Sequence, residues 1–166
     1  MILGMSLSTY TAVHVLISLV GICSGLLVVF GLLNGRRLDV LTAVFLATTA
    51  LTSITGFGFP FDHLGPAHII GILSLLVLAL AIPARYIFHM TGPWRSIYVL
   101  GSAIALYFNV FVLVVQSFEK VPALKALAPT QKELPFVFVQ LLVLLTFATI
   151  TVFSIIRFHP ERAQSA

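Results

Sequence analysis

Five long apolar stretches constrain this chain more than any other feature, because every Lys, Arg, Asp and Glu lies between or beyond them. The stretches cover residues 10–33, 40–59, 67–84, 96–118 and 136–156. Each is long enough to cross a hydrocarbon core of about 30 Å at about 1.5 Å per residue. Because backbone polar groups find no water in that core, each stretch must be a helix. The sequence therefore predicts an all-α, polytopic membrane protein with five transmembrane helices.

The composition of the chain agrees with a membrane-embedded bundle. Of its 166 residues, 60% are hydrophobic and 8% are charged. Five spans and short connections use nearly all of it, so we expect a single transmembrane helical-bundle domain over residues 1–166. The net charge of +4 is spread over the connections, which is typical of topology signals and does not indicate a nucleic-acid partner.

The distribution of basic residues predicts the orientation. Six of them fall on one side of the expected bundle: Arg36, Arg37, Arg85, Arg95, Arg157 and Arg162. Three fall on the other side: Lys120, Lys125 and Lys132. The side richer in basic residues is normally cytoplasmic. We therefore expect the N-terminus outside, the C-terminus inside, and a multi-pass protein of the cell inner (plasma) membrane.

Aromatic residues near the ends of the spans are typical of interfacial belts. Three lie at the expected inner boundary: Tyr86, Trp94 and Tyr98. Five lie near the outer one: Tyr10, Phe59, Phe61, Phe118 and Phe136. The sequence thus predicts that these side chains sit at the level of the lipid headgroups.

The longest connection, residues 119–135, contains a second kind of helical signal. Pro122 is suited to open a helix and Pro129 to close it, with apolar residues three to four positions apart between them. This pattern predicts a short amphipathic helix on the outer membrane surface. An irregular loop is the alternative.

Two pairs of small residues indicate where helices approach closely. Gly21 and Gly25 are four residues apart in the first span, as are Gly101 and Ala105 in the fourth. Small residues at this spacing allow helix backbones to come together in membranes. We expect these positions to be helix contacts.

Polar residues of the spans gather in the expected outer half. Set aside most Ser and Thr, which can bond to their own helix backbone. The candidate ligand-binding residues are then His14, Thr52, Ser53, His68, Asn109, Gln116 and Gln140. Polar groups in hydrocarbon are costly unless they meet each other, water or a ligand. The layer predicts either a polar pocket open to the outside or interhelical hydrogen bonds that only fix the bundle.

Other chemistries receive less support from the sequence. Coupled transport usually needs an ionisable group deep in the membrane, and no span contains Asp, Glu, Lys or Arg. Asp62, His63 and His68 have no recognised metal-ligand spacing, so no metal site is predicted. No Gly-x-Ser-x-Gly motif occurs, and enzyme activity is not favoured. A b-type haem held by His14 and His68, at matching depth, stays open as an alternative.

Three segments resemble small uncharacterised bacterial inner-membrane proteins. They are Gly65–Gly71, the stretch from Tyr107 to Gln116, and Lys120–Leu124. The resemblance implies a bacterial origin, and no function comes with it.

These observations predict a non-enzymatic integral membrane protein. It would be an accessory subunit of a larger membrane complex, or the binder of a small apolar or amphipathic ligand, such as a lipid or quinone, in the outer-half pocket. No cofactor is predicted. In the alternative, an electron carrier, the cofactor would be haem b.

Overall fold

The computed structural model describes residues 4–60 and 65–159, and all regular structure in these ranges is helical. Its helices are α1 (Leu7–Leu33), α2 (Asp39–Gly56), α3 (Pro66–Tyr86), α4 (Pro93–Lys120), α5 (Pro122–Leu127) and α6 (Leu134–Arg157). Five of them, all but α5, are long and apolar enough to cross a membrane. The all-α fold with five candidate transmembrane helices is therefore confirmed.

Local signals explain where the helices begin and end. Ser6 caps α1, since its hydroxyl accepts a hydrogen bond from the backbone N–H of Thr9 at 3.1 Å. Proline stands in the first turn of α3, α4, α5 and α6, where its missing N–H costs nothing. The largest differences from the expected ends are three residues, as where α2 ends at Gly56 instead of residue 59. A turn at Phe57 and Gly58, followed by Pro60, ends α2 early.

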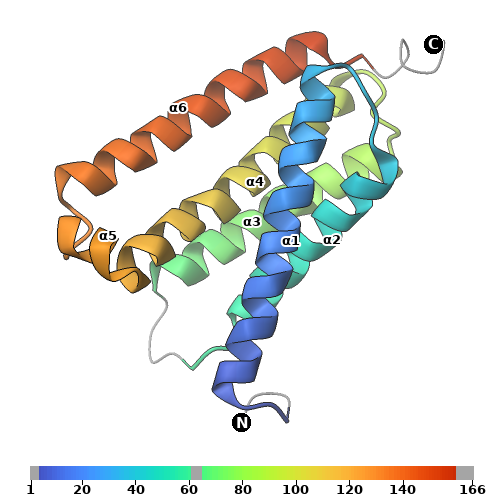
Figure 1. The fold of residues 1–166 in the computed structure, drawn as a ribbon. Coiled ribbons are helices and arrows are strands. Elements are labelled where there is room, and N and C mark those ends of the chain that lie inside the picture. The colour runs from blue at the N-terminus through green and yellow to red at the C-terminus, as the bar shows by residue number, and fades with distance from the viewer. Residues whose placement is uncertain (1–3, 61–64, 160–166) are drawn as a thin grey trace.

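Helix α4 is the centre of the bundle. It packs against α1, α2, α3, α5 and α6, whereas the described residues of α6 pack chiefly against α4 and α1. Figure 1 shows α6 lying along α4 on the side away from α3, and the N-terminal half of α1 diverging from α4 and α6. Side chains of Val28, Phe45, Leu78 and Leu106 fill the core between the helices.

The small residues of α1 and α4 lie at close helix contacts, as predicted. A Cβ atom added to Gly25 would lie 2.7 Å from Leu106 and 2.8 Å from the Phe45 ring. One added to Gly101 would lie 2.9 Å from the Cβ of Ala81. Glycine is thus what allows α1 to approach α2 and α4, and α4 to approach α3.

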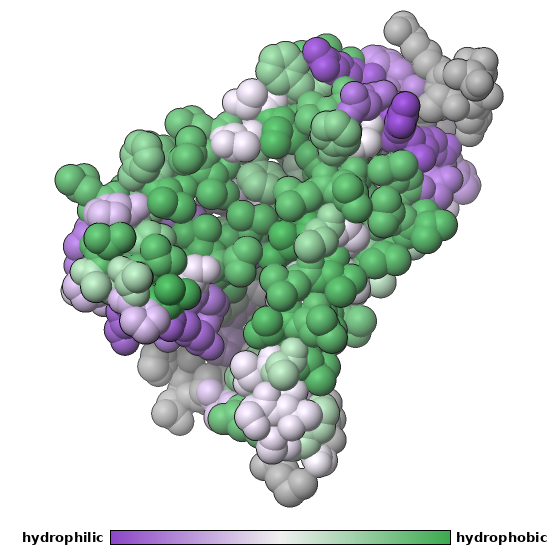
Figure 2. Space-filling view, in the orientation of Figure 1, coloured by the Kyte–Doolittle hydropathy of each residue, from purple (hydrophilic) through white to green (hydrophobic). Residues whose placement is uncertain are grey.

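The outer surface of the bundle is apolar. Large hydrophobic side chains on every long helix are exposed, among them Leu16, Phe30, Leu76 and Phe138. In Figure 2 hydrophobic residues cover the middle of the visible face, and hydrophilic residues gather towards its two ends. Such a band is what a bilayer covers, so the surface supports the membrane assignment.

Arg85 and Tyr98 are part of the core, and the burial of Tyr98 corrects one expectation from the sequence. The Arg85 side chain is 3% exposed and forms an ion pair with Asp39, the first residue of α2. Its guanidinium also lies 5.1 Å from the centre of the Tyr98 ring, which is fully buried. Tyr98 is therefore not a belt residue, and Tyr10, 4% exposed, is not one either. Phe61 lies outside the described residues.

The connection between α4 and α6 contains the short helix α5, which confirms helical structure there. Two side chains hold the rest of this connection. Gln131 donates a hydrogen bond to the carbonyl oxygen of Val115 at 3.0 Å. The carboxylate of Glu133 accepts hydrogen bonds from the hydroxyl and backbone N–H of Thr130 and from the backbone N–H of Lys132.

Candidate functional site

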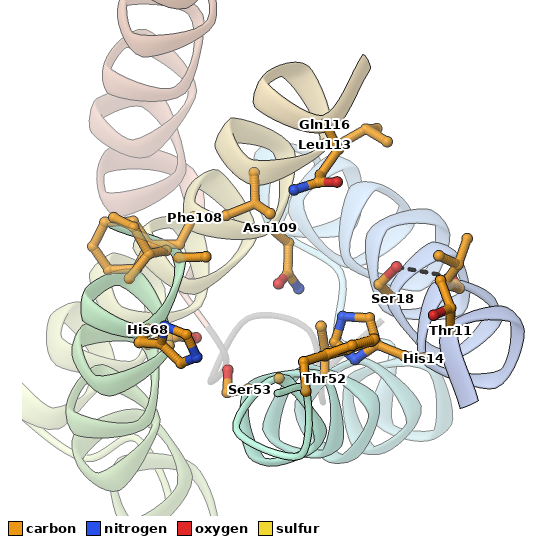
Figure 3. Close-up of a pocket in the computed structure, with 18 of the residues that line it drawn as sticks. Thr11, His14, Ser18, Thr52, Ser53, His68, Phe108, Asn109, Leu113 and Gln116 are labelled. Carbon is orange, nitrogen blue, oxygen red and sulfur yellow. Dashed lines mark hydrogen bonds between the residues drawn. The ribbon is translucent and has the colours of Figure 1, made fainter. Parts of the chain in front are cut away.

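A cavity of about 770 Å³ opens among four helices at one end of the bundle. Its walls are the N-terminal half of α1, the C-terminal end of α2, the N-terminal half of α3 and the C-terminal half of α4. Six of the seven residues predicted from the sequence line it: His14, Thr52, Ser53, His68, Asn109 and Gln116. Figure 3 shows His14, His68 and Asn109 pointing from three helices into the same space.

Each helix contributes one stripe of side chains to the cavity, as helical periodicity requires. On α4 the lining includes Asn109, Leu113, Gln116 and Lys120, spaced three or four residues apart. Asn109 is the deepest polar member of this stripe and Lys120 lies where the helix ends. The stripe therefore runs from a polar amide near the middle of the bundle to a cation at its rim.

The hydrogen bonds around His14 indicate which of its two ring nitrogens carries the hydrogen. Thr55 uses its one hydroxyl hydrogen to bond to the carbonyl oxygen of Leu51 at 2.7 Å. The same hydroxyl oxygen lies 2.8 Å from Nδ1 of His14 and must then accept a hydrogen from it. In the neutral imidazole this leaves Nε2 without a hydrogen. His14 accordingly offers a hydrogen-bond acceptor to whatever enters the cavity.

Asn109 is positioned by a residue that the sequence reasoning did not select. Its Nδ2 donates a hydrogen bond to the hydroxyl of Thr49 at 3.2 Å, and Thr49 is fully buried on α2. Thr49 precedes Ser53 by one helical turn, so that spacing on α2 was the available signal. The contact holds the amide in place and leaves the second N–H of Nδ2 for another partner.

Ser74 is the second residue that the sequence reasoning missed. It lines the cavity from α3, is 2% exposed, and its hydroxyl has no hydrogen-bond partner among the described residues. Other hydroxyls, such as those of Ser24 and Thr48, bond to carbonyl oxygens of their own helix. Setting serine aside as self-satisfied is therefore wrong at Ser74, where a buried polar atom lies beside a cavity.

The His68 side chain helps to cap the start of its own helix, α3. Its Nδ1 accepts a hydrogen bond from the backbone N–H of Gly65 at 3.2 Å, which closes a capping interaction at the start of α3. An Nδ1 that accepts carries no hydrogen, so the neutral ring has its hydrogen on Nε2. The ring lies 5.7 Å, centre to centre, from the ring of Phe57, another lining residue.

Gln140 lies away from the cavity. It belongs to α6, and its Nε2 donates a hydrogen bond to the carbonyl oxygen of Phe111 on α4 at 3.2 Å. Its Oε1 is buried and has no partner among the described residues. The structure therefore separates Gln140 from the other six predicted residues and places it between α4 and α6.

Aromatic rings and a single charge complete the lining. Phe57, Phe59 and Phe108 contribute rings, and the Phe59 ring meets that of His14 edge to face at 5.1 Å. Among the described residues that line the cavity, Lys120 is the only Lys, Arg, Asp or Glu. The walls thus combine apolar and aromatic surface with neutral hydrogen-bonding groups.

No described group of three or more His, Cys, Asp or Glu side chains is arranged to hold a metal ion. Asp62 and His63, considered with His68 in the sequence, lie outside the described residues. The fold and the cavity define a helical protein with five candidate membrane spans and, at one end, a mostly apolar recess that contains a few polar groups. No protein-family model, curated protein or solved structure matches the chain.

Proposed function

We propose that this protein is a non-enzymatic integral membrane protein that binds a small amphipathic molecule, a lipid or a quinone, in the cavity between α1, α2, α3 and α4. The observation that carries the proposal is the cavity itself. Its volume of about 770 Å³ lies in the range of about 300–1,000 Å³ typical of small-molecule sites. Mostly apolar walls with a few convergent polar groups are also typical of such sites.

The polar atoms at the cavity support a ligand over a purely structural role. Interhelical hydrogen bonds would satisfy the polar layer without any space between the helices. Here Asn109 is partly satisfied by Thr49, and among the described residues no hydrogen bond uses Nε2 of His14, another lining residue. Buried polar atoms cost free energy unless they are hydrogen-bonded. A ligand with matching polar atoms, or water in its absence, would supply the missing bonds.

The haem alternative is less well supported by the geometry. An axial histidine uses a ring nitrogen that carries no hydrogen. In neutral His68 the nitrogen without a hydrogen is Nδ1, and the backbone N–H of Gly65 already occupies it. Binding iron through Nε2 would require the loss of that capping bond. A visible absorption spectrum of the purified protein, with or without a Soret band, decides between the two proposals.

The ligand-release experiment compares two similar changes, each of which replaces a side-chain amide by leucine. We expect the protein, purified in mild detergent, to carry a small amphipathic molecule that mass spectrometry identifies. Asn109→Leu should release it while the fold is retained. Gln140→Leu, a matched control on α6 outside the cavity, should leave it bound. Wild-type protein without any bound molecule, or equal retention by both variants, would contradict the proposal.

We further propose that the cavity opens outwards from a bacterial inner membrane, with the N-terminus outside and the C-terminus inside. The excess of Arg on one side supports this orientation. A reporter fused after Ala166 should then report the cytoplasm, and a tag inserted between Ala123 and Gln131 should be reached from outside. A periplasmic C-terminus would reverse the assignment. An accessory subunit would in addition copurify with a fixed partner protein.

A further inference from the structure

The cavity has a lateral opening towards the bilayer. Val15 and Leu19 on α1 and Leu113 on α4 all line the cavity, yet they are 44%, 41% and 40% exposed. A residue that is both lining and exposed marks the edge of a cavity. Figure 2 shows the molecular face hollowed between the N-terminal half of α1 and the end of the bundle that carries α5. Figure 3 shows the space between α1 and α4 beside Leu113.

Hydrogen-bonding groups and aliphatic side chains occupy different parts of the cavity. Two groups that can hydrogen-bond to a ligand, His14 and Asn109, come from α1 and α4. The edge that faces the bilayer is made of aliphatic side chains. An amphipathic molecule matches this pattern only with its head among the polar groups and its tail in the lateral opening, because a tail placed inside would leave those groups unsatisfied.

The charge of the cavity indicates an uncharged head. Lys120, at the rim, is the only described lining residue with a permanent charge. A phosphate drawn down to Asn109 would lose its hydration without gaining a cation, and such burial is strongly unfavourable. Carbonyl or hydroxyl oxygens make the same hydrogen bonds at much lower cost. Asn109 would donate to a carbonyl, and Nε2 of His14 would accept from a hydroxyl.

The aromatic lining indicates a flat head. Phe57, Phe59 and Phe108 contribute rings to the cavity, next to the imidazoles of His14 and His68. Aromatic side chains gain energy by stacking on, or meeting edge to face, another planar ring. A glycerol backbone offers no such surface. The lining therefore fits a conjugated ring better than the neutral head of a diacylglycerol.

We propose that the ligand is a quinone or quinol, seated with its ring beside His14 and Asn109 and with its isoprenoid tail leaving through the lateral opening between α1 and α4. This inference rests on the proposed function and adds the class of ligand and its direction. The ring is held by neutral hydrogen bonds and aromatic contacts. The tail stays in contact with lipid, so the molecule can exchange with the membrane without crossing the headgroup region.

The test compares a ring without a tail and the same ring with a long tail. The probes are 2-methyl-1,4-naphthoquinone and a menaquinone with a long isoprenoid chain, added to the full-length protein in detergent and followed by calorimetry. In the double variant Val15→Trp/Leu113→Trp the indoles narrow the lateral opening. We expect the affinity for the long-tailed quinone to fall by about tenfold or more, because apolar tail contacts are lost. Affinity for the tail-less ring should be unchanged, which also shows that the variant is folded.

A matched control uses positions on the same helices that face lipid but do not line the cavity. Leu16→Trp/Leu100→Trp fulfils this condition, since both residues are exposed and neither lines the cavity. It should bind both probes as the wild type does. If the Val15→Trp/Leu113→Trp variant binds both probes as tightly as the wild type does, or binds neither of them, the lateral seating of the tail is overturned.

Two further outcomes separate the ligand class from the proposed function. Wild-type protein that binds an anionic phospholipid but neither quinone would overturn the quinone assignment and leave a binding cavity in place. Wild-type protein that binds none of these molecules would overturn both proposals. As a second measurement, a menaquinone with a photoreactive diazirine near the ring end of its tail should label α1 and α4 next to the opening. Labelling confined to α6 would contradict the inference.

Discussion

The substitution Gly25→Ala tests whether the close approach of α1 to α2 and α4 stabilises the bundle. The added Cβ would lie 2.7 Å from Leu106 and 2.8 Å from the ring of Phe45, distances that real Cβ atoms essentially never show. The end of the Leu106 side chain can rotate away, but Phe45 is completely buried and its ring has no free space. Overpacking of this kind costs about 1–3 kcal/mol.

A matched substitution in another helix isolates the overpacking. Replacing a mid-helix glycine by alanine also gains about 0.5–1 kcal/mol from helix propensity. Gly71→Ala should show this gain alone, because its nearest neighbour, Phe57, would be 3.5 Å from the new Cβ, an ordinary contact. The difference between the two variants, about 1–3 kcal/mol, is then the overpacking term.

The assay is reversible unfolding in mixed micelles, followed by circular dichroism as sodium dodecyl sulfate is added. We expect Gly25→Ala to unfold at a lower detergent fraction than the wild type and Gly71→Ala at an equal or higher one. Equal stability of the two variants would refute the reasoning, since it would mean that α1 does not approach α2 and α4 as closely as the structure has it.

Three further outcomes are expected. Asp39→Asn leaves the buried Arg85 without its anion and should destabilise the fold by about 1–3 kcal/mol in the same assay. This is less than the cost of breaking a fully buried ion pair, because Asp39 is 68% exposed. Desolvation raises the pKa of Glu133, but hydrogen bonds from Thr130 and from backbone N–H groups outweigh it and hold that pKa below its usual value. These hydrogen bonds therefore stabilise the connection at pH values above the ordinary carboxyl range, and the stabilisation is lost as the pH falls through the lowered pKa. Amide hydrogen exchange at Thr130, corrected for its intrinsic rate, should then become faster at acid pH. In Glu133→Gln it should be faster already at neutral pH. Cys23, exposed on α1, should resist maleimide in membranes, where no water supports the thiolate, and react once the protein is unfolded; fast labelling of the native protein would show that this face is not in lipid.

The fold could be predicted because the bilayer leaves little choice. Long apolar stretches must be helical there, and prolines in the first turns of four helices fix where they begin. The sequence pattern does not show in which direction the side chain of a residue near a helix end points. Arg85 and Tyr98 lie at the depth expected of interfacial residues, but their side chains point inwards and meet each other and Asp39.

Prediction of the candidate site from the sequence has the same limit. Depth along a helix follows from counting residues, and depth correctly grouped His14, Asn109 and Gln116 on one cavity. The direction in which a residue points around its helix depends on which neighbours the helix has. Gln140 has a suitable depth, but α6 contacts α4 from another side, so its amide meets the carbonyl of Phe111 instead. Ser74 is the reverse case, since only the packing shows that its hydroxyl is buried without a described partner.

The cavity and the small residues of α1 are connected by geometry. Gly25 brings the C-terminal half of α1 against Phe45 and Leu106, and from there the helix diverges from α4 towards its N-terminus, as Figure 1 shows. Two helices that touch at one level and cross at an angle must separate at the other. The His, Asn and Gln side chains that line the cavity lie in the half where the separation occurs, and aliphatic residues line its edge. One close contact therefore produces both the space for a ligand and its opening to the bilayer, which is why a side chain at Gly25 should disturb the cavity as well as the core.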